Sequence, residues 1–208
     1  MQEKLDPSKT ALLIIDMQND LVANEIGPFS LLVKQVKENK VIENIAKLLK
    51  VARERRLPIF HIKTVRRANG KDVWPALTDA SELLGRQVLL KMRESLIEGT
   101  YGAEFVDELK PLSTEYIIEK RRSDAFYQTS LELFLRRLAT DTLILTGVIT
   151  SGCVSATAIG ARERDFNVII VRDCCADMRK ETHDFFVKMV FPFMGRVRTV
   201  EQIITSLS

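Results

Sequence analysis

The sequence predicts an α/β protein in which a central, mostly parallel sheet lies between two layers of helices, a three-layer α/β/α sandwich. Short apolar runs rich in β-branched residues alternate with longer segments of helical period, and this alternation is typical of βαβ units. The runs are continuously apolar, as are strands that are covered on both faces. The length of 208 residues suits one domain, and we expect residues 1–208 to form it.

Each expected element has its own signal in the sequence. The expected strands are 11–16, 59–63, 116–120, 143–148, 168–172 and 196–199, and the expected helices are 41–56, 130–138, 152–164, 180–190 and one at the end of the chain. Thr129, with Glu132 three residues later, predicts a capping box at the second of these helices. The region 64–110 is less regular, which indicates an excursion that covers a site.

The charge balance favours a small-molecule substrate over a nucleic-acid partner. Lys and Arg number 31 against 28 Asp and Glu, a net charge of +3, and the basic residues form short clusters. We interpret these clusters as solvated faces: Arg53–Arg56, Arg66-Arg67, Arg121-Arg122 and Arg136-Arg137. Of these, only Arg121 and Arg122 fall near the suspected chemistry.

Cysteine usage and the first apolar run predict a cytoplasmic protein without a membrane partner. The three cysteines, with Cys174 and Cys175 adjacent, offer no disulfide framework of the kind that secreted domains have. We expect Cys174 and Cys175 to be packed and inert. The first apolar run, 11–15, is too short for a signal peptide or a membrane span.

Polar residues at the ends of the expected strands indicate where the chemistry lies. Ligands of open parallel sheets bind beyond the carboxyl ends of the strands, and these ends carry the following residues: Asp16, Lys63, Lys120, the turn 148–153 and Arg172-Asp173. Cys153 lies in a Thr/Ser/Gly turn at a helix start, where free N–H groups and the helix dipole favour a thiolate.

Cys153, Asp16 and Lys120 form a complete set for acyl transfer, with a nucleophile, a proton carrier and a cation. Each residue alone also has a structural interpretation: a packed thiol, a helix cap and a solvated ammonium.

Four motifs together resemble the isochorismatase-like cysteine hydrolases, and they occur in the order Leu13–Asp20, Gly99–Glu104, Ile118–Phe126 and Thr146–Val154. The resemblance implies the isochorismatase-like, Rossmann-like fold and a catalytic triad of Asp16, Lys120 and Cys153. It also implies a non-proline cis peptide between Val148 and Ile149, with the N–H groups of Ile149 and Cys153 as the oxyanion hole. Members of this superfamily usually form dimers or tetramers, so the resemblance implies that this chain forms a homodimer or a homotetramer.

Within the superfamily, the Thr-Ser-Gly-Cys-Val run, His183 and Phe185-Phe186 look most like the N-carbamoylsarcosine amidohydrolase branch. Two positions depart from it. That branch often carries an arginine where this chain has Ser155, and a small residue in place of Asp124. A substrate carboxylate would then need Arg121, Arg122 or Arg172.

Four further side chains are expected to bind the substrate, namely Gln18, Trp74, Arg122 and Phe126, with Trp74 as an aromatic wall. The chain contains two histidines, His61 and His183, and it lacks the Asp-x-His that the metal-dependent relatives carry after the second strand, so we expect no metal. No glycine-rich nucleotide motif is present, and we expect no cofactor.

The function that these observations predict is hydrolysis of a small amide, carbamoyl or ureido C–N bond through a thioester. One alternative is a vinyl-ether hydrolase of the isochorismatase type, which would need the aspartate but not the thiol. Another is a catalytically silent binding or scaffold protein on the same fold.

Overall fold

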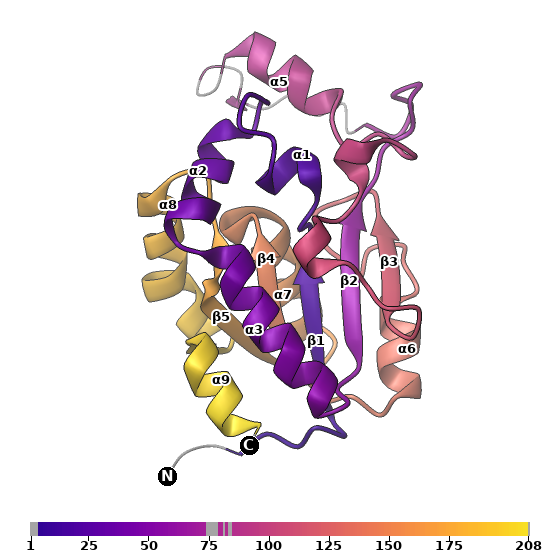
Figure 1. The fold of residues 1–208 in the computed structure, drawn as a ribbon, viewed down its shortest axis with the longest axis vertical. Coiled ribbons are helices and arrows are strands. Elements are labelled where there is room, and N and C mark those ends of the chain that lie inside the picture. Colours follow the sequence, from indigo (N-terminus) through magenta and orange to yellow (C-terminus); the bar gives the residue numbers. More distant parts are fainter. Residues whose placement is uncertain (1–3, 74–78, 81, 83–84, 208) are drawn as a thin grey trace.

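The computed structural model describes residues 4–73, 79–80, 82 and 85–207, and it confirms the predicted α/β class. Its centre is a six-stranded sheet of order β3-β2-β1-β4-β5-β6 in which all neighbours are parallel (Figure 1). The strands are β1 (Thr10–Ile15), β2 (Ile59–Thr64), β3 (Tyr116–Lys120), β4 (Thr142–Val148), β5 (Asn167–Ala176) and β6 (Arg196–Arg198).

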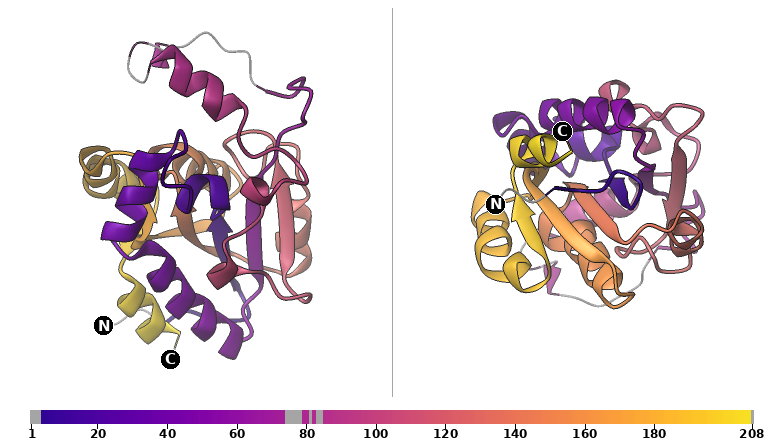
Figure 2. Two further views of the ribbon diagram at one scale, coloured as in Figure 1. Left: turned by 45° about the horizontal axis from the view of Figure 1, so that its top comes forward. Right: turned by 90° about the horizontal axis from the view of Figure 1, so that it is seen from below.

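Helices cover both faces of the sheet. The helices are α1 (Asn19–Val22), α2 (Ser30–Glu38), α3 (Val41–Glu54), α5 (Arg86–Arg93), α6 (Leu131–Arg137), α7 (Ser155–Arg162), α8 (Lys180–Phe185) and α9 (Val200–Ser206). α2, α3 and α9 pack on one face, and α6 and α7 lie on the other (Figure 2). None of the helices in the described part of the chain is long and apolar enough to cross a membrane.

Burial on both faces explains why β1 reads as a continuous apolar run. Leu12 and Ile14 pack into the core on the α3 side, whereas Leu13 and Ile15 pack into the core on the α7 side. All six residues of β1 are buried. The alternation of side chains along a strand therefore places every second residue in a different core.

Several local predictions differ from the structure. The expected helix 180–190 is α8 followed by a π-helical turn, Phe186–Val190, and α1, α2 and α5 were not predicted. The capping box at Thr129 was wrong: its hydroxyl accepts from the Leu131 N–H at 3.2 Å, while Glu132 pairs with Arg164 at 2.8 Å. The competing ion pair removes the glutamate that a capping box needs. A capping box forms instead at Thr199, which begins α9.

The order of the strands changes direction between β1 and β4. From β1 the chain adds β2 and β3 on one side, and then it crosses to β4 and continues outward to β5 and β6. The two connections after β1 and β4 therefore leave the sheet in opposite directions. In doubly wound sheets a crevice opens at this reversal, beyond the carboxyl ends of the strands.

Candidate active site

The ammonium of Lys120 lies at the centre of a buried polar cluster at this reversal. Its Nζ donates to Asp16 Oδ2 at 2.8 Å, to Thr64 Oγ1 at 2.7 Å and to Cys153 Sγ at 3.2 Å. A lysine ammonium has three N–H donors, so each of them has a partner. The structure thus brings together Asp16, Lys120 and Cys153, as the strand ends and the resemblance predicted, and it adds Thr64.

Asp16, Thr64 and Lys120 come together because three neighbouring parallel strands end in register. Thr64 and Lys120 lie opposite each other at the ends of β2 and β3. Asp16 follows β1 directly, with a left-handed φ of 56° that Asp tolerates better than most residues, and its N–H donates to Ile62 O at 2.8 Å. The Thr64 hydroxyl then donates to Asp16 Oδ1 at 3.1 Å.

Thr64 was not among the expected site residues, because the expected strand ends at Lys63, one residue before the end of β2. Side chains alternate along a strand, so the two residues point to different faces. Lys63 pairs outside the cluster with Glu104 and Glu119, at 3.5 and 3.4 Å. Extending β2 by one polar residue would have included Thr64 among the candidates.

The nucleophile turn, residues 149–154, follows β4 and holds Cys153 half-buried beside the cluster. The Val148–Ile149 peptide is cis in the structure, and the Ile149 carbonyl accepts from the N–H groups of Gly152 and Val154 at 3.0 and 3.2 Å. Just before the turn, a Cβ on Gly147 (φ +107°) would lie 2.0 Å from the Ile15 carbonyl oxygen. Glycine at this position therefore lets β4 pass close to β1 as the turn begins.

The side chains of Asp177 and His183 contact the nucleophile turn. Asp177 is buried and accepts from the Ser151 N–H at 2.7 Å, and His183 Nδ1 lies 2.9 Å from Thr150 Oγ1. Burial lowers the pKa of His183. Asp177 was not among the predicted residues, because the predicted strand ends at Arg172, four residues before the end of β5.

The electrostatics of the cluster favour a thiol rather than a thiolate in the resting site. Burial, with the Asp16 carboxylate adding to it, raises the pKa of Cys153 to about 12, although Lys120 acts in the opposite direction. The resting site therefore does not favour the thiolate expected from the helix start, because desolvation and the Asp16 carboxylate outweigh Lys120. Burial would lower the pKa of Lys120, but Asp16 and Cys153 raise it overall, so the ammonium stays charged.

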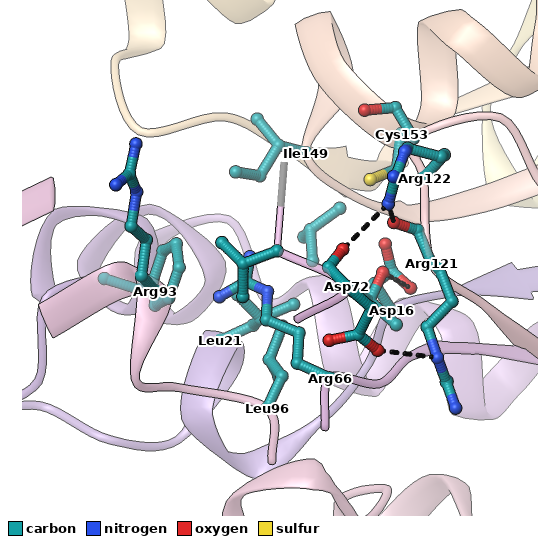
Figure 3. A pocket seen from close by; sticks show the side chains of 15 residues that line it. Asp16, Leu21, Arg66, Asp72, Arg93, Leu96, Arg121, Arg122, Ile149 and Cys153 are labelled. Atoms are coloured by element: carbon teal, nitrogen blue, oxygen red, sulfur yellow. Dashed lines mark hydrogen bonds and ion pairs between the residues drawn. The ribbon is translucent and has the colours of Figure 1, made fainter. Parts of the chain in front are cut away.

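A cavity of about 450 Å³ opens above Cys153 (Figure 3). Its apolar walls include Leu21, Phe29, Leu96, Val148 and Ile149, and its polar lining includes Asp16, Thr64, Arg66, Asp72, Arg93, Arg121, Arg122, Ser123 and Cys153. Arg66, which we had assigned to a solvated face, is half-buried in this wall. Its position two residues after the end of β2 was the signal that could have placed it there.

Of the residues expected to bind substrate, some line the cavity and others are buried in the fold. Arg122 lines the cavity, but Gln18 and Phe126 do not. Gln18 is fully buried, and its amide bonds backbone groups of Thr64 and Ala103 at 2.7–2.9 Å, so its polar atoms are committed to the fold. Phe126 is buried and stacks on Phe166. Trp74 lies outside the described residues.

The remaining predicted residues lie away from this cavity. Ser155 is buried in α7, and Asp124 packs against the same helix at Gly160. Arg172 borders a second cavity of about 290 Å³, which His183 also lines. Cys174 and Cys175 are buried free thiols whose pKa is raised by burial. Within the described ranges, no three His, Cys, Asp or Glu side chains gather as metal ligands do.

The fold and the site together define an α/β protein with a buried Asp–Lys–Cys cluster at the reversal of a parallel sheet. The chain belongs to the isochorismatase family: the isochorismatase domain model matches residues 10–202. Members of this family are hydrolases, and some of them are amidohydrolases that act on C–N bonds.

Individual relatives agree with this assignment. A probable inactive nicotinamidase of Arabidopsis thaliana is 34% identical over 84% of both chains. An N-carbamoylsarcosine amidase of Arthrobacter sp. is 34% identical over 66% of this chain and 50% of its own. The crystal structure of a cysteine hydrolase from Pseudomonas syringae pv. phaseolicola shares the fold, with a TM-score of 0.81, 22% identity, and coverage of 97% of this chain and 93% of that one.

Proposed function

We propose that the protein is a cysteine-dependent hydrolase that cleaves the C–N bond of a small amide, carbamoyl or ureido compound through a thioester. The main support is that one ammonium, Lys120 Nζ, lies 2.8 Å from the Asp16 carboxylate and 3.2 Å from the Cys153 sulfur. This arrangement places a base, a nucleophile and a fixed positive charge in reach of one another beside a cavity. The amidase activity named for an Arthrobacter relative is further support.

In the first half of the reaction, Asp16 takes the proton of Cys153 while the sulfur attacks the substrate carbonyl carbon. Because the pKa of Cys153 is about 12, the proton leaves as the bond forms, and Lys120 stabilises the negative charge that moves to sulfur. The N–H groups of Ile149 and Cys153 bind the oxyanion, and one such donor typically contributes about 2.7–4 kcal/mol. Asp16 then protonates the leaving nitrogen, and the C–N bond breaks.

In the second half, a water molecule gives a proton to Asp16 and attacks the thioester carbonyl. The C–S bond breaks, the acid leaves, and the sulfur of Cys153 recovers the proton from Asp16. Lys120 keeps its charge throughout, because its raised pKa holds the ammonium protonated. The cycle consumes one water and restores the starting site.

The test is ammonia release from small amides, carbamoyl amino acids and ureido acids by the wild type and its variants. We expect Cys153→Ala and Asp16→Asn each to abolish turnover in protein that is still folded, as a cooperative thermal unfolding transition would show. Cys174→Ala is the matched control, because it removes a buried thiol that does not line the cavity, and it should retain turnover. Turnover that survives in Cys153→Ala would overturn the covalent mechanism.

Two other outcomes have support in the comparisons. The family is named for isochorismatase, and cleavage of a vinyl ether by protonation from Asp16 would survive Cys153→Ala. A relative that is 34% identical is described as probably inactive, and a silent protein would turn over neither amides nor vinyl ethers. Adding isochorismate to the panel, assayed by loss of its vinyl ether, with the same variants separates the three functions.

A further inference from the structure

Gln18 reaches the candidate active site through the backbone of Thr64. Its Oε1 accepts from the Thr64 N–H at 2.9 Å, and its Nε2 donates to the Thr64 carbonyl oxygen at 2.8 Å. The second hydrogen of Nε2 is donated to the Ala103 carbonyl oxygen at 2.7 Å. Both donors and the acceptor of the amide are therefore used, and the side chain is fully buried. A substrate cannot touch this amide, so Gln18 can affect the reaction only through its neighbours.

β2 continues beyond the point where β1 ends. The last paired residues of the two strands are Ile15 and Ile62, and the chain turns away from the sheet at Asp16, with a φ of 56°. On its other side β2 pairs with β3 as far as Thr64, which lies opposite Lys120. The last residue of β2 therefore has a partner strand on one side and none on the other.

The amide of Gln18 takes the place of the missing strand. In a parallel sheet the N–H and the carbonyl of one residue point to the same neighbouring strand. Gln18 binds both of these groups of Thr64 on the β1 side, while the next N–H, that of Val65, donates to the Lys120 carbonyl oxygen at 3.1 Å on the β3 side. Because a buried backbone group without a partner is costly, the two hydrogen bonds from Gln18 hold the end of β2 in the sheet.

The backbone that is held in this way carries the hydroxyl that joins the catalytic cluster. Thr64 Oγ1 accepts from Lys120 Nζ at 2.7 Å and donates to Asp16 Oδ1 at 3.1 Å. A threonine side chain is stiff at χ1, so the direction of its hydroxyl follows from its backbone. Lys120 and Asp16 therefore keep this partner only while the Thr64 backbone stays in place.

We propose that Gln18 is a positioning residue for the reaction: it completes the end of β2 and thereby orients the Thr64 hydroxyl between Lys120 and Asp16. The proposal rests on the function proposed above, in which Asp16 takes and returns the proton of Cys153. A small misplacement of such a group lowers the rate of the chemical step without weakening the binding of substrate. Loss of the Gln18 amide should therefore lower kcat and leave KM little changed.

The first test is a double-mutant cycle of Gln18→Met and Thr64→Val, measured as kcat for ammonia release. Methionine has a similar length but no amide. We expect each single variant to lower kcat by about tenfold or more. The double variant should be no slower than Thr64→Val, because Gln18 acts through the Thr64 hydroxyl. Losses that multiply in the double variant would overturn the proposal.

Asn19→Leu is the matched control. Asn19 Nδ2 donates to the Tyr101 carbonyl oxygen at 2.9 Å, so it holds the same loop that Gln18 reaches at Ala103, but it does not bind Thr64. The control should lose stability and keep most of its kcat. A loss of kcat as large as that in Gln18→Met would assign the effect to the loop and overturn the role of Thr64.

Gln18→Glu gives a milder variant in case Gln18→Met does not fold. A protonated carboxyl keeps an acceptor for the Thr64 N–H and one donor, whereas an ionised carboxylate has no donor and faces carbonyl oxygens. Relative to the wild type, this variant should recover most of its kcat at low pH and lose it as the carboxyl ionises. Burial raises the pKa of such a carboxyl, so the loss should come above the usual range of glutamate. No recovery of kcat at any pH would contradict the proposal.

A third test needs no turnover, so it separates this proposal from the proposed function. The rate at which iodoacetamide alkylates Cys153 follows the fraction of thiolate. Without the Thr64 hydroxyl, Asp16 accepts more strongly from the thiol and disfavours its ionisation, so alkylation at pH 8 should slow by about threefold or more in Thr64→Val and by the same factor in Gln18→Met. An unchanged rate in Gln18→Met would refute the positioning role. The expected slowing in a protein that turns over no amide would leave that role and refute the hydrolase.

Discussion

At the scale of the residue, the proposed chemistry depends on the hydrogen-bond partners of the buried Lys120 ammonium. Taking an ammonium out of water is costly unless every donor has a partner, and the three partners of Lys120 are the side chains of Asp16, Thr64 and Cys153. The same three contacts therefore meet the requirement of the fold and that of the proposed reaction.

Asp16→Asn should separate the two effects of this carboxylate. The negative charge of Asp16 adds to burial in raising the pKa of Cys153, so its removal should lower that pKa, by about one to three units. The pH profile of alkylation of Cys153 by iodoacetamide should shift to lower pH, while amide turnover is lost with the base. An unchanged or higher midpoint in the variant would contradict this account of the site.

Thr64→Val tests the residue that the sequence did not reveal. The substitution leaves one N–H of Lys120 without an acceptor and Asp16 Oδ1 without its donor. We expect a loss of about 1–3 kcal/mol in the free energy of unfolding and a lower kcat at little-changed KM. Thr64→Ser keeps the hydroxyl and should retain most of both. Equal behaviour of the valine and serine variants would show that the hydroxyl is not used.

At the scale of the element, the nucleophile turn is held by residues beyond its own ends. Asp177 follows β5 and His183 belongs to α8, yet both contact this turn after β4. Asp177 and His183 therefore support the turn without lining the cavity beside Cys153.

Asp177→Ala should lower kcat without a matching change in KM. The variant loses the acceptor that holds the Ser151 N–H at 2.7 Å, and the thiol two residues later is then less well placed. Asp177→Asn retains an acceptor oxygen and should recover part of the rate. Asp184→Ala is the control, because Asp184 lines the same second cavity but pairs with Lys180 and Lys188. A loss of rate in Asp184→Ala of equal size would point to a general effect on α8.

The elements differ in how far the sequence predicts them. α3 and five of the six strands are predicted to within two residues, because burial on the sheet sets their apolar pattern. β5 continues to Ala176, four residues beyond the predicted end. α5 has no fully buried residue, and its short apolar face of Val88, Leu89 and Met92 was not recognised in the irregular region 64–110. The helix is attached through Met92, which packs against the core, and through Arg66, which binds the Met92 carbonyl. Asp16, Lys120 and Cys153 follow from strand ends, whereas Thr64 and Asp177 depend on side-chain direction and contact. The sequence predicted that Gln18 binds the substrate, whereas in the structure its amide forms hydrogen bonds with backbone groups.

At the scale of the whole molecule, a second buried polar cluster lies away from the site. His61 is fully buried, its Nε2 lies 2.8 Å from Glu115 Oε2, and Arg53 holds the same carboxylate at 2.7 Å. His61 Nδ1 is buried without a partner in the part of the chain that the structure describes. A neutral ring that donates from Nε2 satisfies this arrangement, whereas a second ring proton would be buried unpaired.

Stability should therefore fall in mild acid. Burial lowers the pKa of His61 in the folded protein, so below about pH 6.5 the unfolded chain binds a proton that the folded chain does not. His61 alone contributes at most about 1.4 kcal/mol per pH unit, and His183 acts in the same direction. Urea unfolding between pH 7.5 and 5.5 should show this loss, with a shallower slope in His61→Gln. An equal slope in wild type and variant would exclude His61 as a cause.

The reversal between β1 and β4 also bears on how the protein is made. Lys120 and Asp16 are 104 residues apart in the chain, and Cys153 follows 33 residues after Lys120, so no short stretch contains the site. Until β1, β2, β3 and β4 have assembled, Cys153 lacks the contact with Lys120 that belongs to the candidate site. The onset of turnover during refolding then reports closure of the central strands, and any hydrolytic activity appears only in molecules that have completed that step.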